Sequence, residues 1–310
     1  MKIVPATDEN IARAATAIRK GKLVVMPTET VYGLAADAMN QKAVKDIFSA
    51  KDRPSDNPLI IHIADIGQVE TVAREFPKSA QVLAERFWPG PLTLVLWKTP
   101  GVCSEVTGGL DTVGVRMPSH PVALALIRQA GTPLAAPSAN RFMKLSPTKA
   151  EHIDPALARR VELVLDGGAS QVGVESTVVD CTHSTPRILR PGGISRGEIE
   201  AALGAPLGTL PPDPKRRSPG MYQRHYAPQA SLVLVPKLSI EMAGLTFEPP
   251  ANERQIRMPR SSGAYSSMLY DSLHKLDRMK VGTIYVEELP DGAEWEAARD
   301  RLQKASQPRT

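Results

Sequence analysis

The sequence predicts an α/β protein with a twisted, mixed, open sheet flanked by helices, followed by a smaller second α/β domain. Three observations predict this fold. Short apolar runs typical of strands alternate with helix-periodic segments over residues 1–205. Hydrophobic residues make up 42% of the 310 residues, which is enough for ordinary globular cores. A proline-rich stretch then interrupts the alternation, and a shorter alternation follows it.

The elements of residues 1–205 follow from hydrophobic periodicity and from the residues that end each run. Thr7 can cap a first helix that Gly21 ends, because a side-chain oxygen suits a helix start and glycine suits a helix end. Further helices are predicted around residues 44–48, 122–128 and 195–203. Strands are predicted at residues 23–26, 59–63, 92–97, 113–117, 134–136, 161–165, 174–179 and 188–189.

Proline marks the boundary between the two predicted domains. The chain has 28 prolines, or about 9% against an average near 5%. Six of them fall within residues 206–228, which excludes a helix or a central strand there. We therefore predict a semi-extended linker over residues 206–231. Beyond it, strands are expected at 232–235 and 282–286, helices at 264–276 and 295–304, and a loop at 237–262.

The charge balance and the cysteine content limit the class of protein. Lysine and arginine number 38 against 33 aspartates and glutamates, a formal net charge of +5. This mild excess suits a protein that handles nucleotides, phosphates or RNA, and does not by itself diagnose nucleic-acid binding. Cys103 and Cys181 form no disulfide framework, so a cytoplasmic protein is expected. Neither a signal peptide nor a membrane span is expected.

Several common motifs are absent from the sequence. It contains no Gly-x-Gly-x-x-Gly, no Walker A sequence, no His-Glu-x-x-His and no Gly-x-Ser-x-Gly. The histidines and cysteines are scattered without metal-ligand spacing, so no protein-bound metal is predicted. A nucleotide would therefore have to be held by side chains and separate backbone amides rather than by one glycine loop.

Polar residues follow several of the predicted strands, where open α/β sheets place their ligands. Residues 27–34 carry small hydroxyls that suit either a ligand or a capped turn. In residues 51–58, Lys51 and Arg53 alternate, so on an extended segment they would face the same way and suit a polyphosphate. The alternative is a solvated charged loop. His62, taken alone, is more typical of a core histidine than of a ligand contact.

Two further features concern a buried charge and a possible lid. Arg116 lies in a strand of small apolar residues, and a buried arginine needs an anion from either an internal carboxylate or a substrate. Residues 135–140, 146–148 and 173–178 supply more hydroxyls and amides. Residues 218–228 are aromatic and basic, which favours a lid that folds back on the site, the alternative being a rigid spacer.

Taken in order, these segments resemble those of the threonylcarbamoyl-AMP synthase family, in its longer two-domain, YrdC-like form. The nine matching strings run from residue 27 to residue 228 and are PTETVYGL, KDRPSDNPLIIHI, WPGPLT, GLDTVGVRMP, AAPSAN, SPT, GVESTVVD, ILRPG and SPGMYQRHYAP. The resemblance implies a YrdC-like twisted mixed open sheet over residues 1–205 and a small C-terminal Rossmann-like α/β domain over 232–310. After the last predicted strand the chain departs from the family's Gly-rich tail.

The resemblance also implies an activity. Members of this family condense L-threonine, bicarbonate or CO2, and ATP into threonylcarbamoyl-AMP, and release pyrophosphate. We therefore expect a nucleotidyltransferase, an L-threonylcarbamoyladenylate synthase, that uses Mg2+ with its ATP. A downstream transferase complex then modifies the adenosine next to the anticodon of tRNAs that read codons beginning with A.

Site residues are carried over from the family position by position. The threonine site falls on Thr30, His62, Arg116, Ala136 and Ser176. The ATP site falls on Arg53, Asn57, Thr112, Ser138, Ser146, Arg190 and Tyr226. Lys51 and Arg53 are implied to be catalytic, as cations that stabilise the charge growing on the phosphoryl oxygens.

Two readings from other classes remain at this stage. One is an RNA-binding module of the YrdC-like group without synthase activity, which Lys215, Arg216 and Arg217 would suit. The sequence lacks the long basic stripe with interleaved aromatics that this reading favours. The other is a carbamoyl-transfer role like that of hydrogenase-maturation proteins, whose zinc-finger and acylphosphatase-like segments the chain does not contain.

Overall fold

The computed structural model describes residues 3–209 and 222–308. Its N-terminal domain is built on a ten-stranded mixed sheet with the order β1-β8-β2-β3-β7-β4-β6-β5-β9-β10. The strands are β1 (Ile3–Pro5), β2 (Val24–Met26), β3 (Gly33–Asp37), β4 (Ile60–His62), β5 (Leu92–Trp97), β6 (Thr112–Arg116), β7 (Leu134–Ala135), β8 (Val164–Asp166), β9 (Thr177–Asp180) and β10 (Arg187–Arg190).

Helices cover both faces of this sheet. They are α1 (Asp8–Arg19), α2 (Gln41–Lys51), α3 (Val69–Val72), α4 (Lys78–Phe87), α5 (Ser104–Thr107), α6 (Pro121–Ala130), α7 (Pro155–Ala158) and α8 (Arg196–Leu203). The apolar faces of α1 and α6 enclose one core, whereas α2, α4 and α7 contribute to a second, separate core. Two cores on opposite faces explain why most strands carry continuous apolar runs.

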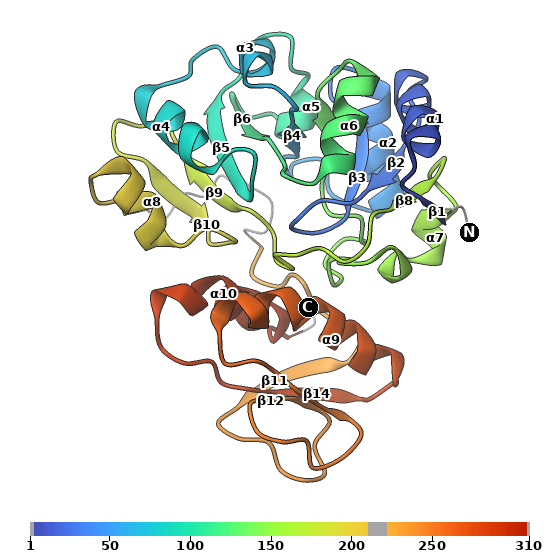
Figure 1. Ribbon diagram of the computed structural model, residues 1–310, viewed down its shortest axis with the longest axis vertical. Coiled ribbons are helices and arrows are strands. Elements are labelled where there is room, and N and C mark those ends of the chain that lie inside the picture. The colour runs from blue at the N-terminus through green and yellow to red at the C-terminus, as the bar shows by residue number, and fades with distance from the viewer. Residues whose placement is uncertain (1–2, 210–221, 309–310) are drawn as a thin grey trace.

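The C-terminal domain is a four-stranded, all-parallel sheet with the order β11-β14-β12-β13. Its strands are β11 (Ser231–Val235), β12 (Gly244–Thr246), β13 (Gln255–Arg257) and β14 (Thr283–Glu287). Helices α9 (Ser262–Arg278) and α10 (Glu296–Ala305) lie between this sheet and the N-terminal domain (Figure 1). The prediction of a mixed α/β fold followed by a second α/β domain is confirmed.

The structure corrects the sequence prediction in several places. The segment 237–262, expected to be a loop, contains β12 and β13. Strands β1 and β3 and helix α4 were not predicted either, and β3 reads Gly-Leu-Ala-Ala-Asp, which carries no β-branched residue. The strand expected at 174–179 begins only at Thr177, so residues 174–176 lie outside the sheet, where Val174 and Glu175 contact the other domain. Of the predicted linker, residues 210–221 lie outside the described part of the chain, Lys215, Arg216 and Arg217 among them.

The two domains share a continuous apolar core. Val31, Leu145 and Val174 of the N-terminal domain pack in the same cluster as Leu269 and Leu273 of α9. At Gly173, with φ +75°, the backbone comes so close to Ser267 that a Cβ would lie 2.4 Å from its Cα. This contact holds residues 174–176 against α9 and fixes one wall of the site described below.

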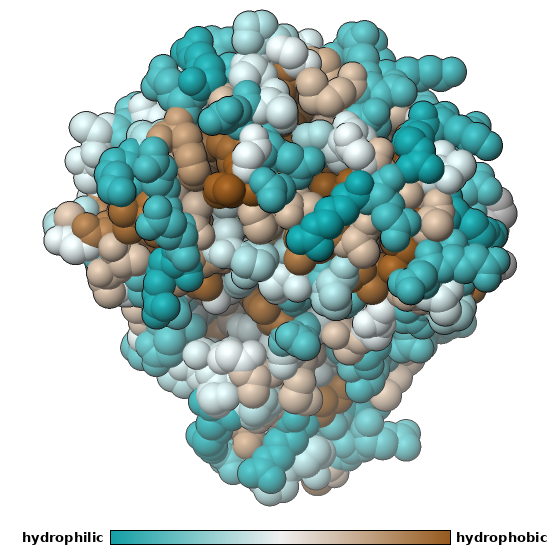
Figure 2. Space-filling view, turned by 45° about the horizontal axis from the view of Figure 1, so that its top comes forward, coloured by the Kyte–Doolittle hydropathy of each residue, from teal (hydrophilic) through white to brown (hydrophobic). Residues whose placement is uncertain are grey.

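Neither the described helices nor the surface in Figure 2 shows a feature typical of a membrane-spanning helix. Among the described helices, none is long and apolar enough to cross a bilayer. On the face drawn in Figure 2, apolar side chains form small groups among polar ones rather than one continuous patch.

We predict opposite effects for Ala at two glycines near this wall. A Cβ at Gly192 would lie 2.3 Å from the Thr177 nitrogen and 2.4 Å from the Glu175 carbonyl oxygen, so Gly192→Ala should lose about 1–3 kcal/mol of unfolding free energy. A Cβ at Gly197, in α8, meets nothing within 4 Å, so Gly197→Ala should gain about 0.5–1 kcal/mol. Urea unfolding measures both, and equal midpoints for the two variants would contradict the assigned backbone contact.

Candidate active site

A small, nearly closed cavity lies where several strands of the large sheet end. His62 and Arg116 end the parallel pair β4 and β6 and are register partners, so both reach the same edge. Thr28 follows β2 and Ala136 follows β7, which brings two more loops to this point. The cavity volume is about 40 Å3, room for about one water molecule. The predicted site residues that line it are Thr30, Arg53, His62, Arg116, Ala136, Ser138, Ser176, Arg190 and Tyr226.

Arg116 is buried and bound by an internal carboxylate. Its Nη2 donates to Glu29 at 2.5 Å, its Nη1 to the Thr30 hydroxyl at 2.9 Å, and its Nε to the Gly90 carbonyl at 3.2 Å. The Thr28 hydroxyl donates to the Val31 carbonyl, so it accepts from Thr30 at 2.8 Å. Three of the five N–H groups of Arg116 are thus engaged, and two remain for a ligand in the cavity.

Arg53 and Asn57 keep polar atoms without partners. The Arg53 Nη2 donates to the carbonyl oxygens of Asn57 and Pro58 at 3.2 and 2.9 Å. Among the described residues, its Nε has no hydrogen-bond partner, and neither side-chain polar atom of Asn57 has one. Burial lowers the pKa of Arg53 to about 10, so the guanidinium stays charged at neutral pH. Buried polar groups left unpaired cost free energy, so this corner of the site favours a ligand that pairs with them.

Lys51 lies beneath the cavity and does not line it. The residue ends α2, and Asp52 then turns into the left-handed region at φ +52°, so Lys51 and Arg53 do not alternate on an extended segment as predicted. The Lys51 Nζ donates to the carbonyl oxygens of Ser138 and Asn140. Burial and the nearby Arg53 lower its pKa well below the usual value. In this structure Lys51 holds the loop that carries Ser138.

Ser176 and Arg190 form a further wall of the cavity. The Arg190 guanidinium donates to the Ser176 carbonyl at 2.9 Å and to its hydroxyl at 3.1 Å. The same hydroxyl lies 2.8 Å from that of Thr93. His62 is buried, and desolvation together with the charge of Arg116 lowers its pKa to about 3, so it is neutral at physiological pH.

Glu175, beside Ser176, is the contact between the site and the C-terminal domain. Its carboxylate accepts from Ser146 Oγ at 2.5 Å, from Tyr270 OH at 3.1 Å, and from Arg301 Nε at 2.7 Å. Burial alone would raise its pKa, but the charges of Arg301 and Arg190 lower it to about 2. Glu175 is therefore an ionised anchor for these three donors rather than a proton acceptor.

The segment 225–226 closes the cavity from above. Tyr226 is buried, and the Arg301 guanidinium lies 4.8 Å from the centre of its ring. Its φ of +58° is strained for a residue other than glycine. Within residues 3–209 and 222–308, the Tyr226 hydroxyl and His225 Nδ1 have no hydrogen-bond partner. The two residues thus fill the space over the cavity while leaving polar atoms unpaired.

Not every predicted residue lines the cavity. Ser146 turns its hydroxyl to Glu175, Asn57 packs behind Arg53, and Lys51 supports the Ser138 loop. Thr112 begins β6, four residues and about 13 Å along the strand from Arg116.

Sequence reasoning missed Glu29, Glu175, Tyr270, Arg301 and His225. One signal was available for Arg301, because it falls on the apolar face of α10 with Ala298, Leu302 and Ala305.

One cluster of histidine and acidic side chains lies at the domain interface and is not suited to a metal ion. Glu151, His152 and Asp271 come within ligand distance of one another. However, the Thr148 backbone N–H donates to His152 Nδ1, so the proton of the neutral ring is on Nε2. Lys149 and Lys275 lie 2.9 and 2.8 Å from the Asp271 oxygens and already neutralise them.

Comparison with known proteins identifies the family. The family model described as telomere recombination matches residues 16–192, and the model described as threonylcarbamoyl-AMP synthase, C-terminal domain, matches residues 194–307. The threonylcarbamoyl-AMP synthase of Bacillus subtilis is 44% identical over 96% of this chain and 93% of its own. The chain belongs to the threonylcarbamoyl-AMP synthase family. It is therefore an enzyme family member, and the predicted resemblance is confirmed.

One similar solved structure covers both domains of this chain, and another covers part of it. The crystal structure of Pyrococcus abyssi Sua5 complexed with L-threonine superimposes with a TM-score of 0.87 at 40% identity, covering 98% of this chain and 96% of that one. Escherichia coli YciO covers 62% of this chain, with a TM-score of 0.52 and 26% identity.

We predict that Arg301 stabilises this synthase mainly by compensating Glu175. Arg301→Met should cost about 3–5 kcal/mol of unfolding free energy, because it leaves a buried carboxylate without its counterion. The double variant Glu175→Gln with Arg301→Met should recover part of the loss. The half-buried Arg299→Met, which removes a hydrogen bond to the Pro290 carbonyl but no buried counterion, should cost at most about 1.5 kcal/mol. Urea unfolding of the four proteins measures this. An Arg301→Met variant as stable as Arg299→Met would disprove it.

We also predict that acidification lowers the free energy of unfolding already at pH values above those at which carboxylates titrate. The pKa values of buried His62 and His152 are lowered to about 3, so below pH about 6.5 the unfolded chain takes up protons that the folded chain does not. Unfolding free energy should therefore fall from pH 7 to pH 5, by at most about 1.4 kcal/mol per pH unit per histidine. His152→Asn should flatten this dependence, because it removes one of the two groups that cause it. Constant stability over this range would contradict the prediction.

Proposed function

We propose that the chain is an L-threonylcarbamoyladenylate synthase, a nucleotidyltransferase that joins L-threonine, bicarbonate or CO2, and the adenylyl group of ATP. The observation that carries the proposal is the arrangement of buried arginine side chains around the closed cavity. Arg116 and Thr30 line it, and so does Arg53, whose Nε has no hydrogen-bond partner among the described residues. A zwitterion and a polyanion held at adjacent positions are what this condensation requires.

The threonine half of the proposal rests on Arg116 and its neighbours. The two N–H groups of Arg116 that remain can bind a carboxylate, and one Glu29 oxygen has no partner in the described part of the chain. Thr30 and Ser176 offer hydroxyls, and neutral His62 adds an uncharged wall. The P. abyssi relative, whose structure was solved with L-threonine, supports this choice of amino acid.

The ATP half rests on Arg53, Arg190 and the Ser138 loop. Both arginines are buried and line the cavity, where low dielectric strengthens their attraction for phosphate oxygens. Lys51, which holds the loop, would act by fixing the geometry of this half. The unpartnered atoms of Asn57 and Tyr226 would complete the contacts to the nucleotide.

The reaction follows from these charges. The amine of threonine attacks CO2 and loses a proton, which gives an N-carboxylate. That carboxylate attacks the α-phosphorus, a P–O bond forms, and the bond from the α-phosphorus to the bridging oxygen breaks to release pyrophosphate. Negative charge grows on oxygens that Arg53 and Arg190 would bind, so these residues stabilise the transition state without a covalent nucleophile.

Mg2+ fits this site as an ion carried by the nucleotide. Of the carboxylates described at the cavity, Glu29 is bound to Arg116 and Glu175 to Arg301. Mg2+ commonly keeps several waters and binds through substrate phosphates, which Arg53 and Arg190 would hold. Its contribution when bound is neutralisation of phosphate charge.

We also propose that residues 222–231 act as a lid. A cavity of about 40 Å3 holds no nucleotide, so His225 and Tyr226 must move for ATP to enter. Excluding water afterwards protects the carbamate and the mixed anhydride from hydrolysis. The product would then pass to a transferase complex that modifies tRNA. An RNA-binding role without catalysis would leave the buried cavity unexplained.

The deciding experiment is incubation with ATP, L-threonine and bicarbonate, with detection of threonylcarbamoyl-AMP. Pyrophosphate should appear only when threonine and bicarbonate are both present. Salt-sensitive RNA binding with no pyrophosphate release would favour the RNA-binding alternative and refute the synthase.

A matched pair of variants tests the roles within the site. Arg53→Ala should lower kcat by at least about tenfold, because it removes charge stabilisation, while Arg141→Ala, an exposed arginine paired with Asp52, should leave kcat unchanged. Steady-state kinetics at saturating threonine measures both. If Arg53→Ala kept its kcat and raised only the KM for threonine, the assignment of Arg53 to phosphate would be wrong.

A further inference from the structure

Glu175 places a negative charge at a site that is proposed to bind a polyanion. It lines the closed cavity together with Arg53 and Arg190, the two arginines that would bind phosphate. Like charges repel each other strongly where the dielectric is low. A carboxylate that was free to turn would also compete with phosphate for Arg190, whose charge already lowers the pKa of Glu175. The two arginines can therefore attract a nucleotide best when the charge of Glu175 is neutralised from outside the cavity.

Arg301, in α10, provides this neutralisation. Its Nε donates to Glu175 Oε2 at 2.7 Å, and its side chain is fully buried. Arg301 does not line the closed cavity, so it reaches Glu175 from the side of the C-terminal domain. Its second acidic partner, Asp300 at 2.7 Å, is itself paired with Lys304 at 2.6 Å. The charge of Arg301 is therefore not needed to neutralise Asp300 and remains available to Glu175.

The other polar groups around Glu175 do not replace Arg301. Those that face the carboxylate or feel its charge are Ser146, Tyr270, His225, Tyr226 and Arg190. The first four carry no charge at neutral pH, because burial raises the pKa of both tyrosines and lowers that of the histidine. Arg190 is charged, but it lines the cavity, where the proposed ligand needs it. Arg301 is thus the counterion of Glu175 on the side away from the cavity.

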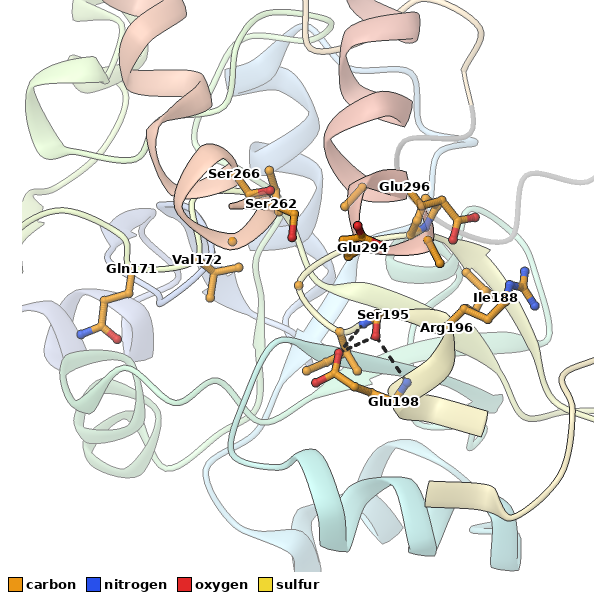
Figure 3. Close-up of a pocket in the computed structure, with 18 residues that line it drawn as sticks. Gln171, Val172, Ile188, Ser195, Arg196, Glu198, Ser262, Ser266, Glu294 and Glu296 are labelled. Atoms are coloured by element: carbon orange, nitrogen blue, oxygen red, sulfur yellow. Dashed lines mark hydrogen bonds between the residues drawn. The ribbon is translucent and has the colours of Figure 1, made fainter. Parts of the chain in front are cut away.

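Close packing does not by itself fix the Glu175 side chain. The segment 174–176 separates the closed cavity from a second cavity between the two domains, which has a volume of about 430 Å3 (Figure 3). Val174 lines the second cavity, whereas Glu175 and Ser176 line the first. The backbone is held, because Gly192 packs directly on it. The direction of the carboxylate depends instead on its hydrogen bonds, of which the one from Arg301 joins two charged groups and is therefore the strongest.

The same guanidinium also contacts the cover of the cavity. The Cζ atom of Arg301 lies over the Tyr226 ring, 4.8 Å from its centre. A guanidinium in this position is attracted by the negative face of the ring. Arg301 thus contacts two residues of the closed cavity, Glu175 in its wall and Tyr226 in its cover, without lining the cavity itself.

From these contacts we propose that Arg301 is a positioning residue for ATP binding. It neutralises Glu175 and holds the carboxylate away from Arg190, so that Arg53 and Arg190 keep their charge for the phosphate groups. The inference rests on the proposed synthase function and deepens it, because it makes the C-terminal domain set the affinity of the site for the nucleotide. Arg301 acts through Glu175 and does not touch the substrate.

The test measures ligand binding to the full chain by calorimetry. ATP with Mg2+ is titrated without threonine and bicarbonate, so that no condensation takes place, and L-threonine is titrated separately. Arg301→Met should weaken ATP binding at least about tenfold, because it leaves a negative charge beside the phosphates. Threonine binding should change by less than about threefold, because a zwitterion carries no net charge. Unfolded protein lowers the number of sites and not the affinity, so a loss of stability does not imitate this difference.

Two variants should restore ATP binding. The double variant Glu175→Gln with Arg301→Met removes both charges, and Arg301→Lys keeps a cation beside Glu175. Both should bind ATP within about threefold of the unmodified chain. Arg299 lies in the same helix, where its guanidinium donates to the Pro290 carbonyl. As the matched control, Arg299→Met should leave both affinities unchanged.

Three results would overturn the inference. They are equal ATP affinity in Arg301→Met and the unmodified chain, an equal loss of ATP and threonine affinity, or a double variant that binds ATP as weakly as Arg301→Met. If Arg301→Met gives no folded protein, Tyr270→Phe decides in its place, because it removes one donor to Glu175 and no charge. It should weaken ATP binding about two- to fivefold, and an unchanged affinity would overturn the inference. Failure of the unmodified chain to bind ATP at all would instead refute the proposed function.

Discussion

The ion pair between Glu175 and Arg301 makes the cavity in the N-terminal domain depend on the C-terminal domain. The two residues are 126 positions apart, and both are buried. A carboxylate in such surroundings persists as an anion only when its charge and lone pairs are matched. The C-terminal domain supplies most of that match through Arg301 and Tyr270, and Arg301 also lies against the ring of Tyr226. Holding Glu175 in place therefore also holds the cavity wall and its cover.

A second matched pair organises the other side of the cavity. Arg116 and Glu29 neutralise each other, and the hydroxyls of Thr30 and Thr28 continue the chain of hydrogen bonds into the loop after β2. In each of the two buried arginine–carboxylate pairs the opposite charges neutralise each other, so neither pair adds net charge at the cavity. The positive charge of Arg53 remains directed at the cavity because its partners are uncharged carbonyl oxygens.

Local patterns predicted much of this arrangement. Capping residues, periodicity and proline placed most helices and the central strands, and the order of motifs placed the residues that line the cavity. Patterns failed where the determining contact is distant in sequence. Strands β12 and β13 have three residues each, and β3 is built from small residues, so the sheet rather than local propensity makes them extended. The partners of Glu175 lie on other elements, and no spacing rule links them. Lys51 and Arg53 were misplaced because the left-handed turn at Asp52 was not recognised.

The smallness of the closed cavity has a consequence for affinity. If only a fraction of molecules is open at any moment, the apparent dissociation constant for a nucleotide equals the intrinsic constant divided by that fraction. The strained backbone at Tyr226 and the unpaired hydroxyl above the cavity raise the energy of the closed state, so they reduce this conformational cost. A substitution that lowered the free energy of the empty, closed form would weaken substrate binding without changing any contact to the substrate. If residues 222–231 open as proposed, the unpaired atoms of this cover help to set the affinity for the nucleotide.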